Sequence, residues 1–138
     1  MSTIYYLNQA VLPTIPTPHD CIITSIEYDS EFLTLKFEDD ISYHDSTKIY
    51  NPNAKSLIIK IHLLDSQFDV YKWERHLFSG KEKGLSLINC NKVFSKINRL
   101  EYLSHYIAYN SMIIELFQSD YIILKIETDF IELEWIEK

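Results

Sequence analysis

The stretch YIILKIETDFIELEW, residues 121–135, decides the fold of this chain. Its apolar residues occupy alternate positions and change phase once, near residues 128–130; the two sets are Ile122, Leu124 and Ile126, then Ile131, Leu133 and Trp135. A two-residue period is typical of a β-strand that buries one face, and a phase change is typical of a reverse turn. The stretch therefore predicts a β-hairpin with an apolar face and an acidic face.

The same period predicts strands elsewhere in the chain. They fall in a hairpin over 21–38, and in the ranges 57–64, 68–77, 101–109 and 112–118. The chain is also rich in aromatic and β-branched residues and has only two glycines, a composition that favours sheets. We expect an α+β fold that is mainly antiparallel β, with about seven strands arranged as a sandwich or a curved sheet.

Three further segments break the strand period. Cys90, Val93, Phe94 and Ile97 follow helical spacing, which predicts one short helix over 89–99. The ranges 39–55 and 79–84 are polar or contain turn-forming residues, so they are predicted as loops. Residues 1–18 contain three prolines and are predicted to be a lead-in segment of a single domain, 1–138.

The bulk composition limits the classes of function. No run of about 18 apolar residues predicts a membrane span, and the first residues lack the pattern of a signal peptide. Cys21 and Cys90 are too few for a disulfide framework, so we expect reduced thiols and a cytoplasmic protein with no membrane partner. A net charge of −7 argues against direct binding of nucleic acid.

Charge is sorted along the chain. Residues 1–50 carry eight acidic residues and two lysines (net −6), residues 51–100 carry four acidic and nine basic residues (net +5), and residues 101–138 carry eight acidic residues and two lysines (net −6). The acidic residues lie largely on alternate strand positions and in turns, where they face solvent or a partner. This sorting favours a protein that docks onto a basic protein.

No motif indicates catalysis. The pairs His19-Asp20 and His44-Asp45 lack the further ligands of a metal phosphohydrolase, and the cysteines and histidines lack zinc spacing. We therefore expect no enzyme, no catalytic residues, no cofactor and no metal. Two alternatives stay open: a small ligand-binding or enzymatic β domain, and an RNA-binding module that uses the basic, aromatic segment 72–99.

Two stretches carry a resemblance to a known group of proteins. They are the run from His19-Asp20-Cys21-Ile22 to Phe37-Glu38-Asp39, and the closing Tyr121–Trp135 segment with its I-E-x-x-x-I-E-L-E-W pattern. Both resemble small acidic bacterial immunity proteins of polymorphic and contact-dependent growth-inhibition toxin systems. The resemblance covers about 35 residues and implies an inhibitor that binds a cognate toxin domain, often a basic nuclease, and covers its active site.

The charge pattern, and not the resemblance, supplies the predicted partner-binding residues. They are Asp29, Glu31, Glu38, Asp39, Asp40, Tyr43, Asp45, Glu127, Asp129, Glu132 and Glu134. The carboxylates among them are expected to pair with lysine and arginine residues of the toxin. A homodimer that pairs acidic with basic segments is compatible with every one of these functions.

Overall fold

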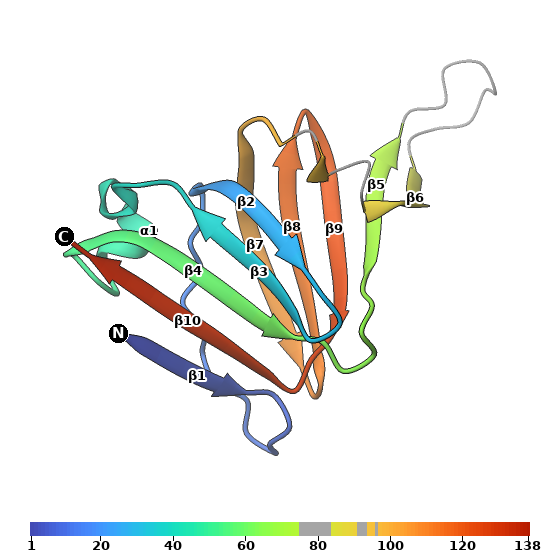
Figure 1. The fold of residues 1–138 in the computed structure, drawn as a ribbon, viewed down its shortest axis with the longest axis horizontal. Helices are drawn as coiled ribbons and strands as arrows, with labels where there is room; N and C mark the ends of the chain where they lie inside the picture. The colour runs from blue at the N-terminus through green and yellow to red at the C-terminus, as the bar shows by residue number, and fades with distance from the viewer. Residues whose placement is uncertain (75–83, 91–93, 96) are drawn as a thin grey trace.

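Ten antiparallel strands form one sheet in the residues that the structure describes (Figure 1). This structure is a computed structural model, and it describes residues 1–74, 84–90, 94, 95 and 97–138. The strands are β1 (Ser2–Tyr6), β2 (Ile22–Tyr28), β3 (Phe32–Phe37), β4 (Ala54–His62), β5 (Asp69–Glu74), β6 (Gly84–Ile88), β7 (Leu100–Ala108), β8 (Ser111–Gln118), β9 (Asp120–Glu127) and β10 (Phe130–Glu137). The predicted antiparallel β fold is confirmed, but with ten strands in place of about seven.

The sheet has two arms joined at a narrow seam. Its strand order is β1-β10-β4-β3-β2-β7-β8-β9-β5-β6. Only two residue pairs, Ile22 with Glu101 and Ile23 with Leu100, join β2 to β7. We call β1, β10, β4, β3 and β2 the first arm, and β7, β8, β9, β5 and β6 the second arm. Figure 1 shows the two arms turned away from a common plane at this seam.

One hydrophobic core is shared by the two arms. Alternate residues point into it; among them are Leu33, Leu35, Ile59, Ile61, Ile131 and Leu133 from the first arm, and Met112, Ile114, Leu116, Ile122, Leu124 and Ile126 from the second. The rings of Phe37 and Tyr102 lie 5.7 Å apart, which joins the arms near the seam. Each fully buried Leu or Ile side chain contributes about 1.5–3 kcal/mol, so the shared core holds the bend.

The prediction for residues 121–135 is right about the strands and wrong about their pairing. β9 pairs with β8 and β5, whereas β10 pairs with β1 and β4. The connection between β9 and β10 therefore passes from one arm to the other, and each strand buries one face in the shared core. A phase change fits this arrangement as well as a hairpin, because both bury one face of each strand.

Neighbouring loops hold this connection. Thr128 is fully buried, its N–H donates to the Asn110 carbonyl (3.2 Å), and its hydroxyl donates to the Phe130 carbonyl (2.9 Å). The Leu7 N–H donates to the Asp129 carbonyl at 2.7 Å, which also fixes the end of β1. Where the chain passes from one arm to the other, its backbone N–H and C=O groups leave the sheet, and these hydrogen bonds give them partners.

The predicted hairpin over 21–38 is confirmed, and the strands predicted over 101–109 and 112–118 pair with each other. β2 pairs with β3, and β7 pairs with β8 through a turn in which Asn110 has a φ of 51°. Asn tolerates this left-handed conformation better than most residues. The strand predicted over 57–64 corresponds to β4, and the strand predicted over 68–77 corresponds to β5 as far as residue 74.

Both terminal strands of the sheet were missed. β1 lies inside the predicted lead-in segment, where Leu7 and Ile15 are also buried in the core. As an edge strand of five residues it shows too little alternation to stand out. β6 begins at Gly84, the last residue of the predicted loop 79–84, of which residues 79–83 lie outside the described part.

Helices are few in the described part of the chain. The predicted loop 39–55 contains a 3-10 turn, Ile41–Tyr43, and a one-turn helix α1, Asp45–Lys48. The helix predicted over 89–99 includes residues 91–93 and 96, which lie outside the described residues, so that prediction stays open. None of the described helices is both long and apolar enough to cross a membrane.

Candidate functional site

The predicted partner-binding residues fall into three groups. The first group lies around the β2–β3 turn and the β9–β10 connection, and it contains Asp29, Glu31, Glu127 and Asp129. The second follows β3 at the opposite end of that strand, and it contains Glu38, Asp39, Asp40, Tyr43 and Asp45. The third lies on β10 and contains Glu132 and Glu134. The sheet therefore distributes these residues over two ends and one face.

The first group is largely engaged in holding turns. Asp29 Oδ1 accepts the backbone N–H groups of Phe32 (2.8 Å) and Glu31 (2.7 Å), and these bonds lower the pKa of the Asp29 carboxyl group. Asp129 Oδ1 lies 2.5 Å from His62 Nδ1. A hydrogen bond to Asp65, in which protonated Glu127 is the donor, raises the pKa of Glu127, and the Asp65 charge adds to the effect. Three of these four carboxyl groups thus already have partners within the fold.

The third group faces a neighbouring strand. Glu132 pairs in register with Lys60 of β4 and Ile4 of β1, and Glu134 pairs with Ile58. Both glutamates are half-buried. Opposite charges directly across a strand pair stabilise a sheet modestly, and Glu132 and Lys60 are placed in this arrangement.

The second group forms a concave surface, which we call the acidic depression. Its volume is about 330 Å³, and its lining includes Asp20, Glu38, Asp39, Asp40 and Tyr43, with His44 and Arg99 also present. Asp45 is in the first turn of α1 and is not part of the lining. Four of the eleven predicted residues are therefore brought together in one site.

Hydrogen bonds fix the shape of the acidic depression. Glu38 Oε1 accepts the Ile22 N–H at 3.2 Å and lies 3.1 Å from His44 Nε2. Behind this pair, the buried Thr47 hydroxyl donates to the Ile41 carbonyl, which ties α1 to the 3-10 turn. Asp40 has a φ of 62°, a conformation that Asp adopts more readily than most residues.

Tyr43 projects from the rim of the acidic depression. Tyr43 is 90% exposed, although hydrogen bonds hold the 3-10 turn that carries it. Asp39 and Asp40 beside it are also exposed. An exposed tyrosine flanked by carboxylates is typical of a protein-binding surface, because the ring offers apolar area and the acids select a basic partner.

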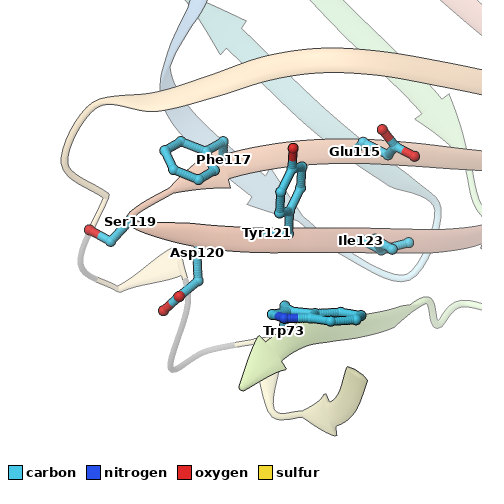
Figure 2. Close-up of a pocket in the computed structure, with 7 residues that line it drawn as sticks. All are labelled: Trp73, Glu115, Phe117, Ser119, Asp120, Tyr121 and Ile123. Carbon is cyan, nitrogen blue, oxygen red and sulfur yellow. The ribbon is translucent and has the colours of Figure 1, made fainter. Parts of the chain in front are cut away.

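A second concave surface was not found from the sequence; we call it the aromatic groove. It has a volume of about 510 Å³ on the outer face of the second arm. Figure 2 shows the lining residues, which are Trp73 of β5, Glu115 and Phe117 of β8, Ser119 between the strands, and Asp120, Tyr121 and Ile123 of β9. They alternate with core residues, so each strand places one set inside and one set in the groove.

Cross-strand register assembles the aromatic groove. Phe117 and Tyr121 are directly opposite each other on β8 and β9, and their rings meet edge to face at 5.6 Å and 73°. Trp73 lies on β5, the next strand across. Sequence reasoning recognised Trp73 only as part of a basic segment, because three strands must be paired before these rings become neighbours.

The two concave surfaces are neighbours on the molecule. Ile22 lines the acidic depression and pairs with Glu101, and Glu101 pairs with Phe117 of the aromatic groove. Arg99, which also lines the acidic depression, lies 4.0 Å from Glu101. One row of residues across β2, β7 and β8 therefore connects the acidic depression to the aromatic groove.

The cysteine and histidine side chains have structural surroundings. Cys21 is fully buried, and burial raises the pKa of its thiol to about 12. His105 lies 2.6 Å from the Tyr102 hydroxyl and 3.2 Å from the Ile15 carbonyl, and burial lowers its pKa. Among the described residues, no cluster of three or more His, Cys, Asp or Glu side chains could hold a metal ion.

Comparison with known proteins adds no relative. No protein-family model, curated protein or solved structure matches this chain. The site is therefore interpreted from its own geometry and charge.

Proposed function

We propose that this protein is an immunity protein, a non-enzymatic inhibitor that binds a basic toxin domain through the acidic depression. The observation that carries the proposal is that Glu38, Asp39, Asp40 and Tyr43 line one preformed surface, with Asp20 beside them. The two acidic blocks of the sequence and the resemblance to immunity proteins support the same reading.

Electrostatics and shape suit the acidic depression to a basic partner. Exposed carboxylates around a concavity attract a basic surface over distances near the Debye length of ~8 Å, which raises the association rate. Tyr43 then supplies apolar contact area at little cost in side-chain entropy. A toxin surface that grips RNA or DNA phosphates is basic, so covering that surface would block substrate approach without chemistry.

Binding through the acidic depression can be tested with a charge-altered variant. Asp39→Lys combined with Asp40→Asn removes two negative charges and adds a positive one, while Asn keeps the left-handed conformation at position 40. The ligand is the purified product of the reading frame next to this gene, which the proposal expects to contain a basic toxin domain, with binding measured by surface plasmon resonance. We expect association at least tenfold slower, and lost growth protection in cells that express the toxin.

Glu31→Lys is the control, and it changes the net charge by two units against three for the double variant. Glu31 is exposed at the opposite end of β3, so its reversal changes the net charge without touching the acidic depression. It should slow association far less than the double variant. Equal effects of the two variants, or an adjacent reading frame whose product does not bind this chain, would contradict the proposal.

A further inference from the structure

We propose that the aromatic groove binds the guanidinium group of an arginine side chain presented by a protein partner. If the proposed function holds, the protein that presents this arginine is the toxin domain bound at the acidic depression. The preference of the groove for a guanidinium group does not depend on that function.

Exposed aromatic area is concentrated in the groove. Phe117 and Tyr121 are 37% and 51% exposed, although they lie in the middle strands of the second arm. Large apolar side chains scattered singly on a surface need no explanation, but rings gathered in one concavity indicate a binding site. The edge-to-face contact between Phe117 and Tyr121 keeps both rings in place without a ligand.

The charge of the groove selects a cation. The described residues that line it include two carboxylates, Glu115 and Asp120, and no lysine or arginine. Lys72 Nζ lies 3.8 Å from Asp120 Oδ2 and offsets that charge. Glu115 is half-buried, and its Oε2 accepts the Ser104 hydroxyl at 3.1 Å. Ser104 thus orients the Glu115 carboxylate, and no lysine or arginine in the described lining offsets its charge.

The geometry favours a flat cation over a compact one. Figure 2 shows the Trp73 indole edge-on, with one face turned toward Tyr121 and Ile123, and Glu115 on the far side of Ile123. A guanidinium group can stack flat on an indole face while the nearby carboxylates attract its charge, whereas a compact ammonium group cannot stack in this way. A nucleic-acid phosphate would instead meet the charges of Glu115 and Asp120.

The experiment is an NMR titration of the ¹⁵N-labelled full chain with three probes. They are N-acetyl-arginine methylamide, the uncharged N-acetyl-citrulline methylamide and a uridine hexanucleotide. We expect saturable shifts of the Trp73 indole N–H and of the Phe117 and Tyr121 amides with the arginine probe, with a dissociation constant on the order of millimolar for a single side chain. The citrulline probe should bind at least fivefold more weakly.

Variants locate the site. Trp73→Ala and Glu115→Gln should each weaken the arginine probe at least fivefold, whereas Tyr106→Ala, an exposed aromatic of β7 outside the lining, should leave it unchanged. Glu115→Gln decides the question if Trp73→Ala does not fold. Equal binding of citrulline, unchanged binding by Glu115→Gln, or shifts only with the hexanucleotide would overturn the inference.

The two proposals can fail separately. The Asp39→Lys, Asp40→Asn variant leaves the aromatic groove intact, so it should bind the arginine probe as the parent chain does. Loss of toxin binding with retained probe binding supports the acidic depression, and loss of probe binding in Glu115→Gln supports the aromatic groove.

Discussion

The Asp129 carboxylate Oδ1 lies 2.5 Å from the imidazole Nδ1 of His62, and both side chains are about a quarter exposed. His62 also stacks on Phe130, with ring centroids 4.7 Å apart. An acid predicted to bind a partner thus anchors the end of β4 to the start of β10. The contact between His62 and Asp129 therefore attaches the segment between β9 and β10 to the first arm.

Asp129→Asn should therefore reduce stability. The substitution keeps the shape of the side chain but removes its charge, and a hydrogen bond to a charged group contributes about 1.5–3 kcal/mol. Because the pair is partly exposed, we expect the free energy of unfolding to fall by about 1 kcal/mol in urea denaturation at pH 7. Glu31→Gln, an exposed carboxylate on the β2–β3 turn, is the control and should change stability little. Equal stability of Asp129→Asn and the parent would show that the contact contributes nothing.

Thr128→Val should destabilise the connection between the arms. Valine has nearly the same shape, but it leaves the Phe130 carbonyl without the donor that Thr128 provides inside the protein. We expect the free energy of unfolding to fall by about 1 kcal/mol, the lower end of the cost of an unpaired polar group, because Phe130 is only half-buried. Thermal or urea unfolding measures this change. Thr34→Val, a half-buried control on β3, should cost less. An equal or smaller loss for Thr128→Val would count against the role assigned to its hydroxyl.

Stability should fall when the pH is lowered from 7 to 5, in part through His105. Burial lowers the pKa of His105 below its ordinary value of 6.5, so the unfolded chain takes up the proton first as the pH falls. Its contribution to stability is complete above pH 6.5 and is lost as the pH falls toward the lower, folded-state pKa. His105→Gln should make the fall in unfolding free energy between pH 7 and pH 5 shallower. An unchanged pH dependence would contradict this assignment.

Cys21 should resist alkylation in the folded protein. Its thiol is buried and its pKa is raised to about 12, so almost no reactive thiolate exists at pH 8. Cys90 is only partly buried, and we expect it to react first with iodoacetamide. Mass spectrometry of the native and urea-unfolded chain measures the two rates. Alkylation of Cys21 at the same rate in both states would show that its burial is incomplete.

The candidate site could be predicted only in part. The clustering of Glu38, Asp39, Asp40 and Tyr43 could be predicted because these residues are close in sequence. They directly follow a predicted strand that ends near Phe37. The aromatic groove was not accessible, because Trp73 and Tyr121 are far apart in sequence and become neighbours only when β5 pairs with β9.

The sequence by itself determined where most strands lie and which of their faces is buried, since the two-residue alternation follows from the pleat of a single strand. Only the tertiary structure decided which strands pair. The 121–135 stretch shows the difference: one apolar face per strand is satisfied either by a hairpin or by two strands that lie in different arms and bury residues in the same core. The packing of two arms around one core, which depends on residues throughout the chain, selected the second arrangement.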